Sequence, residues 1–85
     1  MKLVMIEWVD SQSFTRWVDY DGIDNNLELR CLSVGWLLHE SADRIVIASH
    51  LSDSHVDDSD SPNQITGHMM IPRVSVRQMW ELEEV

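Results

Sequence analysis

The sequence predicts a small, mostly β domain with five strands in one strongly bent sheet. Two apolar runs within residues 32–49 flank a polar turn at 40–43, and this arrangement is typical of a β-hairpin. Gly35 interrupts the first run, and a glycine inside a strand commonly marks a bend. Several short apolar runs separated by turn residues are typical of a small barrel or bent sheet. A chain of 85 residues fits a single domain, residues 1–85.

The apolar runs predict the strands, which we expect in up-and-down order. In the first strand, Val4, Ile6 and Trp8 share one face, and the residues between them are mostly apolar too. Pro72 cannot donate a hydrogen bond to a ladder, so pairing is expected to break between the last two strands. The predicted strands cover residues 3–9, 29–39, 44–49, 65–71 and 74–82.

Two connections have a distinctive composition. Phe14, Trp17 and Val18 fall at the i, i+3 and i+4 spacing of a helix, which predicts one short helix. An irregular segment that covers the sheet is an equally good reading of the same residues. Residues 52–64 carry four aspartates and a single aliphatic side chain, which predicts an acidic, mobile loop within the domain.

The charge balance limits the classes of partner. Fifteen acidic residues against six basic ones give a net charge of −9. This argues against direct nucleic-acid binding, which needs lysine and arginine on the phosphates, and against anionic membranes. No apolar run approaches the ~18 residues of a membrane span. The charge favours a self-repelling soluble surface or, more specifically, a negative face that docks a basic partner.

Cysteine use and chain length predict a compartment and an assembly state. Cys31 is the single cysteine, so no intramolecular disulfide can form, and a reducing cytoplasm is expected. Glu7 and Asp10 interrupt any signal-peptide pattern that follows Lys2. A chain this short buries only about 60–65% of its unfolded surface, so we expect a homo-oligomer.

The sequence predicts no enzyme, and therefore no catalytic residues and no cofactor. Serine, histidine and aspartate are plentiful, but neither a nucleophile elbow nor a glycine-rich phosphate loop is present. No metal site is expected either. His50 and His55 are separated by a strand end, and the aspartate run lacks the glycine and terminal glutamate of a calcium loop.

Two short motifs of the chain resemble those of a known protein family. The first is Gly35-Trp36-Leu37 within VGWLLHESADRIVIA, and the second is Ile71-Pro72-Arg73 within TGHMMIPRVSVRQMWEL. Over residues 29–82 the chain resembles the Sm-like fold, in which a bent five-stranded sheet closes into an Sm-like or SH3-like barrel. The VGWLL and IPR segments also resemble small uncharacterised bacteriophage proteins.

The chain departs from the Sm-like pattern at the residues that bind RNA. Sm-like RNA sites use an aspartate and an asparagine in the first hairpin and an arginine-glycine pair in the last turn. Ser41 and Ile45 stand at the hairpin spacings, and Pro72-Arg73 has no glycine after it. The resemblance therefore implies the scaffold, while RNA binding does not transfer with it.

Five residues are the candidate ligand site. Three of the four tryptophans lie on apolar strand faces and are expected in the core, which leaves Trp17 as the exposed one. With Arg16 and Tyr20 beside it, Trp17 has the composition of a recognition hot spot or of a nucleobase-stacking site. Arg73 and Arg77 near the strand switch can bind an anion, or they can form surface ion pairs with carboxylates.

Three functions follow as expectations. The resemblance implies a non-enzymatic phage accessory protein in the host cytoplasm, which sequesters a nucleotide immune signal of the host at a subunit interface. The first alternative is an acidic inhibitor that mimics nucleic acid and docks a basic host protein. Its expected contact residues are Asp53, Asp57, Asp58 and Asp60. The second alternative is a minor structural or assembly protein of a virion.

Overall fold

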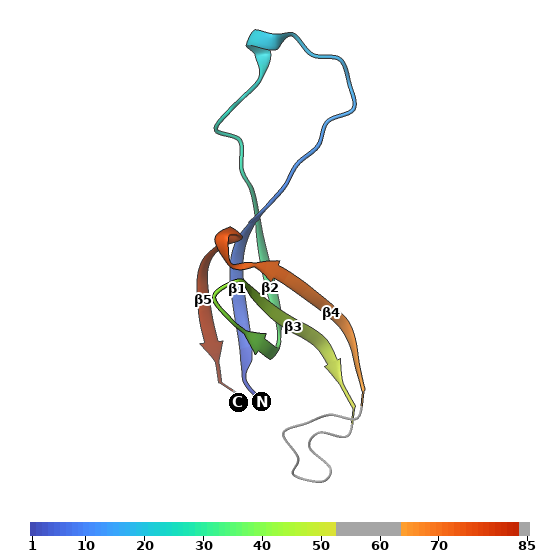
Figure 1. Cartoon of the computed structure of the whole chain (residues 1–85), viewed down its shortest axis with the longest axis vertical. Helices are drawn as coiled ribbons and strands as arrows, with labels where there is room; N and C mark the ends of the chain where they lie inside the picture. Colours follow the sequence, from blue (N-terminus) through green and yellow to red (C-terminus); the bar gives the residue numbers. More distant parts are fainter. Residues whose placement is uncertain (53–63, 84–85) are drawn as a thin grey trace.

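A computed structural model describes residues 1–52 and 64–83 of the chain. Five strands form one antiparallel sheet in the order β4-β3-β2-β1-β5 (Figure 1). This confirms the prediction of a mostly β, five-stranded sheet. The strands are β1 (Leu3–Asp10), β2 (Leu29–Glu40), β3 (Arg44–Leu51), β4 (Ile65–Pro72) and β5 (Val76–Leu82).

The strand order departs from the expected up-and-down order at its last step. β1 to β4 are neighbours in chain order, but β5 pairs with β1 and not with β4. Pro72 ends β4, and a short 3-10 turn, η2 (Arg73–Ser75), redirects the chain. The break at Pro72 is therefore confirmed, and it sends β5 across to the opposite edge of the sheet. Among the described residues, β4 and β5 each pair with one neighbouring strand.

All five strands contribute to one core. A flat sheet cannot collect side chains from every strand at one point, so the sheet must wrap around them. The core therefore lies inside the strong bend that the sequence predicts. Its buried members are Val4, Ile6, Ile45, Ile47 and Ile71, and the partly buried side chains packed against them are Trp8, Leu37, Val76 and Met79.

The bend of the sheet lies in β2, where β2 pairs with β3. Gly35 is buried and lies against the backbone of β3. The pairing between β2 and β3 then shifts register between Leu37 and His39. An extra residue on one strand increases the local twist and bends the sheet. The position that the sequence marks with a glycine is therefore where the sheet changes direction.

The connection between β1 and β2 projects away from the sheet (Figure 1). We call residues 11–28 the arm. Every residue of the arm is exposed, and its one helical turn is the 3-10 turn η1 (Tyr20–Gly22). Phe14, Trp17 and Val18 are not helical, so the short helix predicted from their spacing is wrong, and η1 begins only at Tyr20. The segment is irregular, as the alternative reading has it, but it is exposed and does not cover the sheet.

The predicted acidic loop at 52–64 is closed at its base. The Ser52 amide donates to the Gln64 carbonyl oxygen at 3.0 Å, and the Gln64 amide donates to Ser52 Oγ at 2.8 Å. Residues 53–63 lie outside the described part of the chain. Within the described part, none of the helical segments has the length and apolar character needed to cross a membrane.

Candidate functional site

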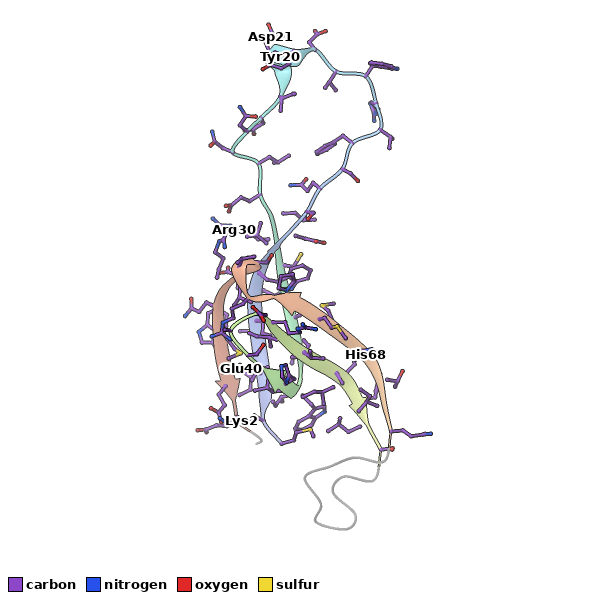
Figure 2. All side chains as sticks on the ribbon, viewed as in Figure 1. Lys2, Tyr20, Asp21, Arg30, Glu40 and His68 are labelled. Carbon is purple, nitrogen blue, oxygen red and sulfur yellow. The ribbon has the colours of Figure 1, made fainter. Side chains whose placement is uncertain are left out.

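The far end of the arm presents two aromatic side chains to solvent. Trp17 is fully exposed, at 102%, and Tyr20 is 93% exposed at the start of η1 (Figure 2). Arg16 precedes them, so three of the five predicted site residues lie together on this segment. The arm therefore holds a large aromatic surface outside any core.

The prediction that Trp17 is the exposed tryptophan is confirmed. Trp8 packs against the core as expected, but the expectation that Trp36 and Trp80 lie in the core is wrong, because they are partly buried in register with Leu3 and Met5.

The rest of the arm adds apolar side chains that the sequence reading missed. Phe14 is 71% exposed, and Val18, Ile23 and Leu27 are more than half exposed. Ile23 and Leu27 stand among the turn-forming residues Asp21, Gly22, Asp24, Asn25 and Asn26, a composition typical of a loop. The signal that could have revealed them is the presence of large aliphatic residues in a segment with no strand or helix periodicity.

Local hydrogen bonds shape the arm. The Gly22 amide donates to the Asp19 carbonyl oxygen at 2.9 Å, which closes η1. The Asn26 amide donates to Asp24 Oδ1 at 3.0 Å, a short aspartate turn. Both bonds join residues close in sequence, so they set the course of the backbone without burying any side chain. Residues 19–26 thus form two local turns, and the apolar groups of the arm stay exposed.

Ion pairs hold the base of the arm to the sheet. Glu28 lies between two arginines, with 3.5 Å from its Oε2 to Arg30 Nε and 3.9 Å from its Oε1 to Arg77 Nη2. All three side chains are largely solvent-accessible. Pairs of this kind contribute about 0–1 kcal/mol to stability. They orient the arm where it meets β2 and β5 more than they stabilise the fold.

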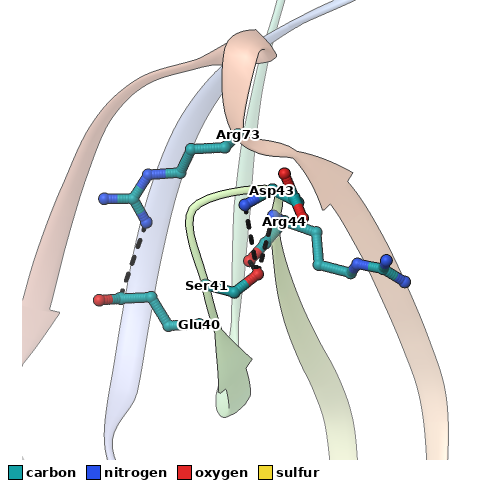
Figure 3. A network of polar contacts seen from close by, with 5 residues as sticks. All are labelled: Glu40, Ser41, Asp43, Arg44 and Arg73. Atoms are coloured by element: carbon teal, nitrogen blue, oxygen red, sulfur yellow. Dashed lines mark hydrogen bonds and ion pairs between the residues drawn. The ribbon is translucent and has the colours of Figure 1, made fainter.

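The two candidate anion-binding arginines are both engaged with glutamates. Arg73 Nη1 lies 4.0 Å from Glu40 Oε2 (Figure 3), and Arg77 pairs with Glu28. Of the two alternatives that the sequence leaves open for these arginines, the structure shows the ion pairs. η2 sits beside the sheet, whereas η1 is at the far end of the arm (Figure 1). One chain therefore does not bring Arg73 and Arg77 together with Trp17.

The turn between β2 and β3 fixes the position of η2. Ser41 Oγ accepts hydrogen bonds from the amides of Asp43 and Arg44, each at 3.3 Å (Figure 3). The Asp43 carbonyl oxygen accepts one from the Arg73 amide at 2.9 Å. Ser41 Oγ therefore shapes the turn itself, and the Asp43 carbonyl oxygen joins the turn to η2. This structural role occupies the hairpin position where an Sm-like protein would carry an RNA-binding side chain.

Two shallow depressions lie elsewhere on the described surface. One is lined by Asp43, Arg44, Met70 and Pro72. The other lies at the open ends of β3 and β4 and includes His50 and Thr66. Neither contains any of the five predicted ligand-binding residues. Arg16, Trp17 and Tyr20 lie on the projecting arm, and Arg73 and Arg77 lie in η2 and β5.

The four aspartates predicted for the alternative, acidic-inhibitor function belong to the 52–64 segment. Asp53, Asp57, Asp58 and Asp60, the contacts expected for an acidic inhibitor, lie outside the described residues. Within residues 1–52 and 64–83, no three histidine, cysteine, aspartate or glutamate side chains gather closely enough to hold a metal ion. Cys31 is a free, half-buried thiol in β2.

Comparison with known proteins adds no further assignment. No protein-family model, no curated protein and no solved structure matches this chain. The resemblance of the VGWLL and IPR segments to bacteriophage proteins therefore stays an expectation.

Proposed function

We propose that this chain is a non-enzymatic binding protein that works by protein–protein association, with the arm as its recognition element. The observation that carries the proposal is the full exposure of Trp17 and Tyr20 at the end of a projecting segment. Tryptophan, tyrosine and arginine are enriched among the residues that dominate binding energy at protein interfaces. Large apolar groups gathered on a surface commonly mark a place where another molecule docks.

The charge of the arm favours a protein over an anionic nucleotide as its ligand. Asp19, Asp21 and Asp24 flank the aromatic side chains, and Arg16 is the single basic residue between positions 11 and 28. A phosphate brought to this segment would meet several carboxylates at close range. An apolar protein surface gains from burying Trp17 without that repulsion. Sequestration of a nucleotide signal stays a prediction, and it needs two subunits to bring Trp17 near Arg73.

We assign the chain to a reducing cytoplasm, because its single cysteine, Cys31, is an unpaired thiol. An accessory role in bacteriophage infection belongs to the same proposal, with the resemblance of two short segments as its support. Both assignments are separate from the binding role of the arm, which stands on the exposed side chains alone.

Site-specific photo-crosslinking in the producing cells tests the role of the arm. The photoreactive residue p-benzoylphenylalanine replaces Val18, which is exposed next to Trp17, and in a control protein it replaces Ala42 in the β2–β3 turn. We expect position 18 to form a covalent adduct with a protein chain, and position 42 to form none. The double substitution Trp17→Ser and Tyr20→Ser should remove the adduct. Equal crosslinking at both positions, or none at position 18, would contradict the proposal.

A further inference from the structure

The sheet carries a second apolar surface, partly exposed, on the side opposite the core. Residues paired across an antiparallel ladder point to the same face. Met5 pairs with Val34 and with Trp80, and Leu3 pairs with Trp36 and with Leu82. These residues alternate with the core residues of β1, so they lie on the side of the sheet away from the core. We call Leu3, Met5, Val34, Trp36, Trp80 and Leu82 the outer face.

The outer face is unusual for a sheet side that meets solvent. Antiparallel sheets with one solvated side normally place polar residues there. Here two adjacent rows across three strands are entirely apolar. In the next row toward the arm, Leu32 is the apolar residue and its neighbours are Glu7 and Gln78. Val34 is 52% exposed and Leu32 is 65% exposed. The outer face therefore has the composition of a surface that another protein layer covers.

The arm and the outer face complement each other in area. The three aromatic side chains of the arm, at 150–250 Å² each when buried, offer on the order of 500 Å². Val18, Ile23 and Leu27 raise this toward the roughly 800 Å² per partner of a standard stable interface. Most side chains of the outer face are already partly buried. Docking one outer face on another would therefore bury less apolar area than docking an arm on an outer face. An arm laid on an outer face reaches the area that a stable dimer needs.

One chain cannot make this contact with itself. The arm leaves the sheet at the ends of β1 and β2 and continues away from it (Figure 1). The described fold is also short of buried apolar residues, with five in the core cluster. Small domains with so little core often gain stability by association. The exchange of an identical element between two copies is a low-cost route to such a dimer.

The geometry points to a second copy of this chain as the partner of the arm. In a two-fold dimer, the arm of each copy packs along the outer face of the other, and Trp17 and Tyr20 are buried against Val34 and Leu32 of the opposite copy. This inference rests on the proposed role of the arm and names its partner. It also accounts for both apolar surfaces with one contact.

Charge gives the dimer a distinctive salt dependence. Each copy carries a net charge of −9, so the two copies repel each other at low ionic strength. Added salt screens this repulsion and leaves apolar burial intact. A dimer of two acidic copies should therefore tighten as salt rises. An arm bound to a basic partner protein would instead weaken with salt, because screening removes an attraction.

Sedimentation velocity on the purified full-length chain tests the inference. We expect a dimer at about 50 µM, with a dissociation constant that falls several-fold between about 50 and 500 mM salt. Trp17→Ser with Tyr20→Ser changes only the arm, and Leu32→Ser with Val34→Ser changes only the outer face. Each double variant should raise the dissociation constant at least about tenfold. Val74→Ser, on exposed η2 and outside both surfaces, is the matched control.

Mixing the two double variants distinguishes arm-on-face docking from other dimers. The arm variant keeps an intact face, and the face variant keeps an intact arm. Their mixture can form one complete arm–face contact, so heterodimers should appear that neither variant forms as a homodimer. An arm–arm or face–face dimer would show no such recovery. Circular dichroism before each run checks that the variants remain folded, and Trp17→Ser with Tyr20→Ser is the safer pair, because both side chains are exposed.

The outcomes separate the two proposals. A monomer at every salt concentration overturns the second-copy inference. If position 18 then still crosslinks to a different protein, and added salt weakens that complex, the arm keeps its binding role with a basic partner. If position 18 forms no protein adduct and the chain is monomeric, both proposals fail.

Discussion

Gly35 of β2 lies directly against the backbone of Ala48 in β3. A Cβ at position 35 would stand 2.9 Å from the Ala48 carbonyl oxygen and 3.1 Å from the Ile47 Cβ. We expect Gly35→Ala to force these strands apart and to lower the free energy of unfolding by about 1–3 kcal/mol. Urea denaturation followed by circular dichroism measures the loss.

Gly22 in the arm is the matched control for this substitution. A Cβ at position 22 would meet nothing nearer than the Asp19 Cβ at 4.0 Å. We expect Gly22→Ala to leave stability unchanged or to raise it slightly, because alanine restricts the unfolded chain. If both variants lost the same free energy, the close approach at Gly35 would not be the cause.

The indole of Trp8 is tied to Ser33 across the β1–β2 ladder. Trp8 Nε1 donates to Ser33 Oγ at 3.0 Å, and Ser33 Oγ lies 4.0 Å from Met69 Sδ. Ser33→Ala leaves a half-buried N–H without its acceptor, so we expect a loss of about 1 kcal/mol. Ser33→Thr keeps the hydroxyl and is the control.

A double-mutant cycle isolates this hydrogen bond from the packing around it. In a Trp8→Phe background the donor is already absent, so Ser33→Ala should cost less than it does in the original chain. The coupling energy from urea denaturation should be about 0.5–1.5 kcal/mol. A coupling energy of zero would mean that the bond contributes nothing to stability.

Truncation of a core residue should lower the stability of the fold, whereas truncation of an arm residue should leave it unchanged. Ile45 is fully buried, so Ile45→Ala should cost about 2–5 kcal/mol and lower the melting temperature sharply. Trp17→Ala removes a larger side chain, but that side chain has no contacts to lose within one chain. At concentrations below the dimer dissociation constant, the melting temperature of the Trp17→Ala variant should match that of the original chain. A much lower melting temperature for this variant would mean that Trp17 packs on its own sheet.

The strands of this protein follow from local patterns. The alternation of Val4, Ile6 and Trp8 with other apolar residues identifies β1, because side chains in a strand point to opposite faces in turn. Pro72 marks the break because it has no amide hydrogen to donate in any context, and Gly35 marks the bend because a glycine inside a strand commonly does so. Each of these features depends on a residue and its near neighbours, which is why sequence reasoning could find them.

Long-range features were harder to predict. The crossing of β5 to pair with β1 joins residues such as Leu3 and Leu82, which are distant in the chain. No local pattern specifies which edge of a sheet a strand will join. The ion pairs of Arg73 and Arg77 depend in the same way on where Glu40 and Glu28 come to rest. The sequence identifies these arginines and leaves two roles open for them, anion binding and surface ion pairing. It does not decide between the two roles.

The amino-acid pattern by itself determined that this chain forms a small, bent, five-stranded sheet and that Trp17 is its exposed tryptophan. Both depend on hydrophobic alternation, which local residues set. The tertiary structure alone decided that the segment around Trp17 projects from the sheet, and that the outer face carries a second apolar surface. Those two facts depend on how β1, β2 and β5 align, and register between distant strands is set by the packing of the whole core.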